Sequence, residues 1–340
     1  MKIRARSPLR ISFVGGGTDL QHWYEKHNGA TLSATINRYA YVSLTPREDQ
    51  EIHIQSVALG YSIKYSLDDD PVYDGVLDLV KAAIGRLGGA HGMELDVRSD
   101  APPGSGLGGS SALTAAVIGA LARNSGRQLT KQKLAELNHT IERVDLGIQG
   151  GKQDQYATTF GGFNLFEFNA DGVKVNRLKI DRDIVSDLEA HLMLCYSGKV
   201  RSNLGLIEKQ VRFYKESRKQ TLEGMQRLYE LVFEMKDALV KGYLEKFGRM
   251  LNEAYTNKKR MNPEVSEGTM VDDLYQAALQ HGAAGAKLLG AGGGGYLLIY
   301  CEIHRQQEVR RVLENMGAQF MDFSFVDLGL KSWQSHGQEK

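Results

Sequence analysis

The sequence predicts an α+β protein of two domains, residues 1–185 and 186–340. A chain of 340 residues is longer than one hydrophobic core usually organises, and its length favours about two domains. Strand patterns dominate the first part of the chain, and a long, charged, amphipathic helical stretch follows in the second. Three glycine-rich loops adjoin these regular segments, so we expect them to meet at one ligand site near the domain boundary.

The first domain is expected to begin with an antiparallel sheet. Four segments are rich in β-branched and aromatic residues or alternate apolar with polar residues, namely 3–14, 31–45, 51–56 and 61–66. Apolar residues at helical spacing over 74–88 precede a strand at 93–98, which leads into the longest glycine loop and a helix over 113–122. Strand, glycine loop and helix in this order are typical of a phosphate-binding site.

Turn and capping residues place the later elements. Thr130 is an expected N-cap for a helix running to about 145, and Asp171-Gly172 predicts a hairpin between strands at 162–168 and 173–180. The second domain is expected to contain the remaining regular segments, which are a strand at 191–197, helical structure over about 204–254, mixed structure over 284–300, a helix at 303–316 and a strand at 319–326.

Composition argues against several classes of partner. Lys and Arg total 42 against 41 acidic residues, a net charge of +1, so no overall field attracts nucleic acid or an anionic membrane. The N-terminus has no apolar signal core and no stretch is long enough to span a bilayer, so we expect a cytoplasmic protein. Cys195 and Cys301 lie in apolar runs and are expected to be buried rather than paired or metal-bound. The sequence leaves a homodimer open.

The loop at 104–109 is the strongest local signal for anion binding. Its glycines allow close backbone approach, and the helix that follows offers unpaired N–H groups and the positive end of its dipole. The spacing also satisfies the G-x-G-x-x-G pattern of dinucleotide-binding oxidoreductases. That class needs an acidic residue about 20 positions later, but none occurs between Asp100 and Glu136. No lysine stands where a Walker A motif requires one.

Five side chains have both a chemical and an ordinary structural interpretation. Ser110 and Ser111 stand at a helix start, where they cap the helix or place a hydroxyl on phosphate-bound Mg²⁺. Glu142 and Asp154 either make a surface ion pair and a helix cap, or divide the tasks of holding Mg²⁺ and accepting a hydroxyl proton. Arg10 is either solvated at a sheet edge or stabilises a transferring phosphoryl group.

Other candidates concern the acceptor substrate. Asp19 follows three glycines and Thr18, and it either caps a helix or binds substrate hydroxyls. Lys199 and Arg201 follow a strand and either form a solvated turn or bind a substrate anion. The histidines have no metal-ligand spacing.

Three segments together resemble the superfamily of galactokinase, homoserine kinase, mevalonate kinase and phosphomevalonate kinase. They are 7–19, 102–112 and 287–295, and they occur in the family's order over essentially the whole chain. The resemblance implies a small-molecule kinase that uses ATP and Mg²⁺. It also implies an N-terminal domain like ribosomal protein S5 and a ferredoxin-like C-terminal domain.

The resemblance also implies roles for individual residues. Asp154 is expected to be the base, Arg10 to stabilise transition-state charge, and Ser110 and Glu142 to serve the metal, although Ser111 is an alternative to Ser110. The residues expected to bind ATP are Pro103, Gly104, Ser105, Gly106, Leu107, Gly108, Gly109, Ser110 and Ser111. The residues expected to bind the substrate are Gly17, Thr18, Asp19, Lys199, Arg201 and Gly293.

Within this superfamily, Gly-Gly-Gly-Thr-Asp at 15–19 is similar to the first motif of bacterial kinases that act on D-glycero-D-manno-heptose 7-phosphate. Such a kinase phosphorylates the anomeric hydroxyl and gives the 1,7-bisphosphate used for nucleotide-activated heptose in surface polysaccharide. The alternatives are a fucokinase-like enzyme of the same superfamily or a protein that binds nucleotides or sugar phosphates without turnover.

Overall fold

The computed structural model describes residues 2–89, 91–200 and 205–335, with the side chains of 199 and 200 outside the description. The strands are β1 (Lys2–Val14), β2 (Gly29–Pro46), β3 (Glu51–Ser56), β4 (Tyr61–Ser66), β5 (Met93–Ser99), β6 (Asn164–Asn169), β7 (Gly172–Arg177), β8 (Leu192–Val200), β9 (Ala283–Leu288), β10 (Gly294–Cys301), β11 (Gln319–Met321) and β12 (Lys331–Ser335). The helices are α1 (Gln21–His27), α2 (Asp78–Leu87), α3 (Gly109–Asn124), α4 (Lys131–Thr140), α5 (Gln153–Phe160), α6 (Arg182–His191), α7 (Leu206–Lys215), α8 (Lys219–Val240), α9 (Leu244–Met261), α10 (Val271–Gln280) and α11 (Ile303–Asn315). Single turns of 3-10 helix occur at Val57–Leu59 and Pro263–Val265, and a π-helical turn at Ile141–Asp145 follows α4.

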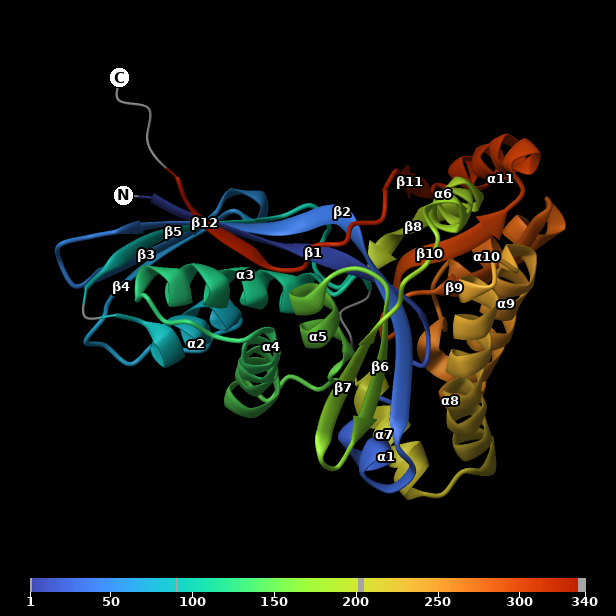
Figure 1. Cartoon of the computed structure of the whole chain (residues 1–340), viewed down its shortest axis with the longest axis horizontal. Coiled ribbons are helices and arrows are strands. Elements are labelled where there is room, and N and C mark those ends of the chain that lie inside the picture. Colours follow the sequence, from blue (N-terminus) through green and yellow to red (C-terminus); the bar gives the residue numbers. More distant parts are fainter. Residues whose placement is uncertain (1, 90, 201–204, 336–340) are drawn as a thin grey trace.

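The larger sheet has eight strands in the order β12-β1-β2-β5-β3-β4, with the β6–β7 hairpin attached to the start of β2. All pairs are antiparallel except β3 with β5. The helices α2, α3 and α4 cover one face of this sheet (Figure 1). Of these, α3 is buried on nearly every side, which suits its run of alanine and aliphatic residues.

The smaller sheet has the order β11-β8-β10-β9, and all its pairs are antiparallel. The helices α9 and α10 pack on β9 and β10 (Figure 1). A long hairpin of α8 and α9 stands beside this sheet and also contacts β1 and β2. The first half of the chain therefore packs directly against the second.

The largest hydrophobic cluster continues across this junction. It combines Phe13 and Leu32 from the first two strands with Val232 and Phe247 from the helical hairpin and Leu298 from the smaller sheet. Phe13 and Phe247 meet edge to face, with 5.2 Å between ring centroids. This shared core fixes the end of β1 and the start of β2 against the second half of the chain, and the first glycine turn, at residues 15–17, directly follows β1.

Most expected strands occur, and the differences have local causes. The helical stretch from about 204 to 254 is three helices, because Ser217 with φ 53° and Gly242 with φ 73° end two of them in left-handed conformation. The strand expected at 319–326 is shorter, since β11 covers Gln319–Met321 and Phe325 makes only an isolated bridge with Ile36. The elements α6, α10 and β12 were not among those predicted from the sequence.

The division of the chain at 185 stays a prediction. The two sheets lie on either side of this position with one exception. Strand β12, from the end of the chain, pairs with β1 in the larger sheet.

Candidate active site

The three glycine loops line one cleft of about 200 Å³ at the junction of the two halves. Gly16 and Gly17 come from the turn after β1, Gly104 to Gly106 and Gly108 come from the turn before α3, and Gly109 to Ser111 form the first turn of α3. Gly290, Ala291 and Gly292 come from the turn between β9 and β10. The expectation that these distant segments share one site is confirmed.

The second and third loops touch so closely that both need glycine. A Cβ on Gly106 would lie 2.8 Å from the Leu289 carbonyl oxygen, and one on Gly290 would lie 2.5 Å from the Gly106 Cα. Both glycines have positive φ, +87° and +68°. Nearby, the Tyr296 amide donates to the Ser105 carbonyl at 3.1 Å. These contacts hold the loop before α3 in place.

The start of α3 presents backbone donors to the cleft. The cap residue is Gly108, in left-handed conformation, and no side chain caps the helix. The amides of Gly109, Ser110 and Ser111 belong to the first turn and have no partner within the helix. The capping role considered for the two serines is therefore not seen, and these amides are suited to an anion.

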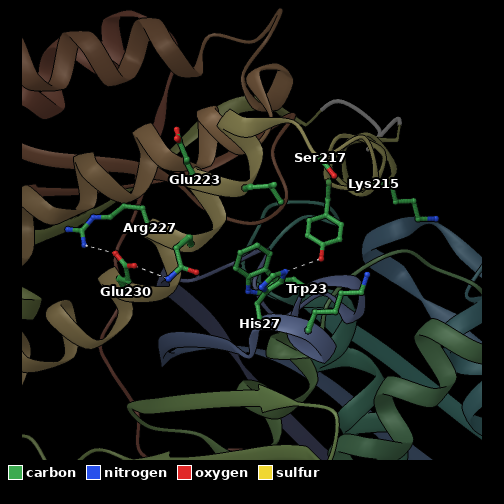
Figure 2. A pocket seen from close by; sticks show the side chains of 11 residues that line it. Trp23, His27, Lys215, Ser217, Glu223, Arg227 and Glu230 are labelled. Carbon is green, nitrogen blue, oxygen red and sulfur yellow. Dashed lines mark hydrogen bonds and ion pairs between the residues drawn. The ribbon is translucent and has the colours of Figure 1, made fainter.

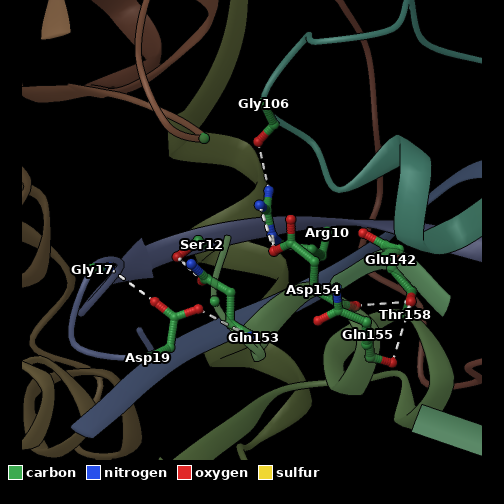
Figure 3. A network of polar contacts seen from close by, with 12 residues as sticks. Arg10, Ser12, Gly17, Asp19, Gly106, Glu142, Gln153, Asp154, Gln155 and Thr158 are labelled. Carbon is green, nitrogen blue, oxygen red and sulfur yellow. Dashed lines mark hydrogen bonds and ion pairs between the residues drawn. The ribbon is translucent and has the colours of Figure 1, made fainter. Parts of the chain in front are cut away.

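Arg10 and Asp154 form the polar centre of the cleft (Figure 3). Arg10 lies on β1 with only 2% of its surface exposed, and Asp154 lies in the first turn of α5. Arg10 Nε donates to Asp154 Oδ1 at 2.8 Å, and Nη2 lies 2.6 Å from the same oxygen. Nη1 donates to the Gly106 carbonyl at 2.5 Å. The arginine is therefore not solvated at an edge, and Asp154 is an ion-pair partner, not a helix cap.

Glu142 is buried, with 2% of its surface exposed, in the π-helical turn that follows α4. Its Oε2 lies 3.4 Å from Arg143 Nη1, whereas Oε1 has no hydrogen-bond partner among the described residues. Burial raises the pKa of Glu142, and the Arg143 charge and the Ser111 side chain oppose this effect. Glu142, Ser110 and Ser111 all line the cleft.

This set of oxygen atoms fits a Mg²⁺ ion bound to nucleotide phosphates. Such an ion takes hard oxygen ligands and needs only one or two protein carboxylates. Glu142 supplies a buried carboxylate with an unpartnered oxygen. The described ranges contain no cluster of three or more acidic, histidine or cysteine side chains that could hold a metal without phosphates.

The first glycine turn is organised by Asp19. Its carboxylate accepts hydrogen bonds from the Gly17 amide at 2.9 Å and the Gln153 amide at 3.1 Å (Figure 3). Burial raises the pKa of Asp19, and these backbone donors oppose the effect. Gly17 and Asp19 line the cleft, whereas the Thr18 hydroxyl is engaged with the carbonyl oxygens of Gly15 and Ala30, away from it.

The structure does not bring every expected residue into the cleft. Leu107 is buried and its carbonyl accepts the Arg10 amide, while the exposed Pro103 lies outside the lining. The Gly293 amide donates to the Val265 carbonyl, and Gly293 is also outside the lining. Arg201 and the side chain of Lys199 lie outside the described residues.

Two buried lysines near the site were not predicted from the sequence. Lys258 Nζ donates to the Leu288 carbonyl at 3.1 Å and the Gly290 carbonyl at 2.5 Å. Lys287 Nζ donates to the Ser12 carbonyl at 2.7 Å. Lys287 stands at the start of the third glycine segment, which was a usable signal. Lys258 lies in an ordinary amphipathic helix pattern, which gives no signal of a binding site.

A larger groove of about 780 Å³ lies between α1, α7 and α8 (Figure 2). Trp23, His27 and Tyr214 form its aromatic wall, and His27 lies 3.2 Å from the Tyr214 hydroxyl. Its one arginine, Arg227, is held by carboxylates, including that of Glu230. The smaller cleft is therefore the candidate active site, because it combines the glycine loops with the Arg10–Asp154 pair.

Comparison with known proteins agrees with this geometry. Models of the GHMP kinases N terminal domain and of the GHMP kinases C terminal region match residues 73–162 and 235–321. The chain is 35% identical to a D-glycero-alpha-D-manno-heptose 7-phosphate kinase of Campylobacter jejuni, over 98% of this chain and 99% of the relative. It is 28% identical to the bifunctional fucokinase/GDP-fucose pyrophosphorylase of Arabidopsis thaliana, over 92% of this chain and 31% of that protein.

Among solved structures, the fold matches a D-glycero-D-manno-heptose 1-phosphate kinase from Bacteroides thetaiotaomicron. The TM-score is 0.83 at 31% identity, and the match covers 98% of this chain and all of the other. The names of the two heptose kinases place the substrate's phosphate at different positions. In the part of the chain that the structure describes, every helix is too short or too polar to cross a bilayer.

Proposed function

The chain belongs to the GHMP kinases and is a phosphotransferase, and from this we propose that it phosphorylates the anomeric hydroxyl of D-glycero-D-manno-heptose 7-phosphate. ATP is the phosphoryl donor, and the products are the 1,7-bisphosphate and ADP. The observation that carries the proposal is the pair of buried Arg10 and partly buried Asp154 between the glycine loops, in a chain that is similar over 98% of its length to a heptose phosphate kinase.

The proposed reaction uses the two members of this pair differently. The Asp154 carboxylate accepts the proton of the sugar's anomeric hydroxyl as that oxygen attacks the γ-phosphorus, and the bond from phosphorus to the bridging oxygen of ADP breaks. Arg10 stabilises the charge on the phosphoryl oxygens during transfer. The ion pair keeps Asp154 oriented before the substrate arrives.

The nucleotide phosphates are proposed to lie against the loop before α3. The first-turn amides of Gly109, Ser110 and Ser111 and the helix dipole favour negative charge there. Glu142 with Ser110 or Ser111 would hold Mg²⁺, which when bound neutralises charge on the β- and γ-phosphates. Leu107 and Pro103 do not line the cleft. The proposed nucleotide contacts are therefore Gly104–Gly106 and Gly108–Ser111.

The sugar is proposed to lie beside Asp19, Gly17 and the Arg10–Asp154 pair. The carboxylate of Asp19 is fixed by two backbone amides and is suited to accept hydrogen bonds from sugar hydroxyls. Lys199 and Arg201 remain candidates for the distal phosphate, since a guanidinium binds phosphate in a bidentate manner. We further propose that the enzyme acts in the cytoplasm and that its product is used to make nucleotide-activated heptose.

Nuclear magnetic resonance of the product tests the position of transfer. With heptose 7-phosphate and Mg-ATP, we expect a product that carries a second phosphate group, whose phosphorus signal couples to the anomeric proton. A new phosphorus signal coupled to any other sugar proton would contradict the proposed anomeric transfer while leaving the kinase chemistry in place.

A further inference from the structure

Three basic side chains meet behind the glycine loops without a matching number of acids. Arg10, Lys258 and Lys287 line one small cavity of about 30 Å³, and no Asp or Glu is part of its lining. Arg10 is paired with Asp154. Within the described ranges, neither Lys258 nor Lys287 makes an ion pair with a carboxylate.

Lys258 is the member of this group best placed to meet a ligand. It extends from α9, is 9% exposed, and lines both the small cavity and the candidate active-site cleft, whereas Lys287 lines only the small cavity. The two hydrogen bonds from Lys258 Nζ go to carbonyls of the third glycine segment. An ammonium group has three N–H donors, so one donor remains for a ligand.

The surroundings of Lys258 disfavour its charged form in the free protein. Burial and the Arg10 charge lower the pKa of Lys258 to about 7. The pKa of Lys287 is also lowered well below its usual range, by burial and by the charges of Lys258 and Arg10. The charged groups that face Lys258 are Arg10 on β1 and Lys287 on β9. Asp154 on α5 is the ion-pair partner of Arg10. An anion that enters the cleft would raise the pKa of Lys258 again, since an opposite charge favours the ammonium form.

We propose that Lys258 is a phosphate-binding residue that takes up a proton when nucleotide phosphates enter the cleft and donates its third N–H to a phosphate oxygen. The inference rests on the proposed kinase function, but it does not depend on which sugar is the acceptor. Because the same ammonium holds the third glycine loop, nucleotide binding would also tighten that loop against the loop before α3.

Lys258 should take up a proton when the nucleotide binds. At pH 8 a lysine with a pKa of about 7 is mostly neutral, so its protonation on binding consumes most of one proton per nucleotide. Because the nucleotide binds the protonated form of Lys258, nucleotide affinity should fall as pH rises above 7, by up to about tenfold per pH unit.

Titration calorimetry at pH 8 measures this uptake directly. The probe is the Mg²⁺ complex of AMP-PNP, an ATP analogue that is not readily transferred, titrated in two buffers of different ionisation enthalpy. The wild type should take up most of one proton per nucleotide. Lys258→Met should bind more weakly and take up none, whereas Lys258→Arg should retain more affinity and also take up none, because arginine is always charged.

Lys259→Met is the matched control, since Lys259 is the next residue on α9 and pairs with Asp272 outside the cleft. It should behave as the wild type. Equal proton uptake by wild type and both Lys258 variants would overturn the proposal and direct attention to Lys287. Thermal unfolding of each variant separates lost folding from lost binding, and Lys258→Arg remains a test if Lys258→Met does not fold. If the folded wild type binds no nucleotide, the proposed function itself fails.

Discussion

Arg10 and Asp154 depend on each other, because a buried guanidinium without a partner is strongly destabilising. Asp154→Asn keeps an oxygen for Arg10 but cannot accept the substrate proton. We expect the turnover number to fall by about 10²–10⁴-fold, with nucleotide affinity nearly unchanged. Steady-state kinetics together with nucleotide titration check this. Equal losses of turnover and nucleotide affinity would point to a structural role for Asp154.

Glu142 allows a test of the proposed metal site. Glu142→Gln should raise the Mg²⁺ concentration needed for half-maximal activity at least about tenfold, while the fold is retained because glutamine has the same shape and keeps an oxygen near Arg143. Burial raises the pKa of Glu142, so protons compete with the metal at higher pH than for an ordinary glutamate. The Mg²⁺ requirement of the wild type should therefore rise as pH falls, and the variant should lose this dependence.

The exposed Glu136 on α4 provides the control for this experiment. Glu136→Gln should leave the Mg²⁺ requirement and its pH dependence as in the wild type. An unchanged Mg²⁺ requirement in Glu142→Gln would remove Glu142 from the proposed metal site.

Individual residues differ in how far the sequence could predict them. Arg10, Asp154 and Glu142 stand in or near recognisable motifs, but spacing alone could not choose between solvated and buried positions. The structure decides this by bringing β1, α5 and the turn after α4 together. Lys258 could not be distinguished from Lys259 and Arg260, because helical periodicity does not show which of three consecutive basic residues faces a cavity.

At the scale of elements, the contact between the second and third glycine loops determines the shape of the cleft. Gly290→Ala places a methyl group 2.5 Å from the Gly106 Cα and keeps a left-handed φ of +68°. We expect a loss of about 2–4 kcal/mol in the free energy of unfolding, from backbone strain and the clash together, with a raised KM for ATP. Urea unfolding and steady-state kinetics measure the two effects.

Gly126→Ala is a matched control, because Gly126 also has φ +68° but a Cβ there meets nothing within 4 Å. This variant should lower the free energy of unfolding only by the backbone strain, about 1 kcal/mol, and leave the KM for ATP unchanged. If the two variants were equally stable, the contact between the loops would not contribute as described.

Elements with strong local patterns were predictable, and those defined by distant contacts were not. The alternation in β3 and β4 and the turn before β7 are visible in the sequence. The short β12 has no such pattern, since its partner β1 lies at the opposite end of the chain. The helix α6 buries only Leu188 and so has a short apolar face, whereas α10 carries Val271, Leu274, Tyr275 and Ala278 at helical spacing, which was a usable signal in the sequence.

At the scale of the whole molecule, the chain returns to its first strand. Strand β12 pairs with β1 over five positions, from Lys2–Ser335 to Arg6–Lys331. Ending the chain after Leu330 should lower the free energy of unfolding by about 1–3 kcal/mol and lower the melting temperature by several degrees. The turnover number should be retained, because β12 contributes nothing to the cleft.

Calorimetry and kinetics on this truncation check both statements. A chain that ends after Ser335 keeps β12 and is the reference against which this loss of stability is measured. A truncation after Leu330 that kept full stability would show that β12 adds little to the larger sheet.

The measurement that tests the central claim most directly is ADP release with Mg-ATP and a panel of acceptors. The panel contains D-glycero-D-manno-heptose 7-phosphate, the unphosphorylated heptose, L-fucose, galactose and mevalonate. We predict strong turnover with the heptose 7-phosphate alone. Turnover with fucose or the free heptose, and none with the heptose phosphate, would contradict the proposed substrate and the role given to Lys199 and Arg201.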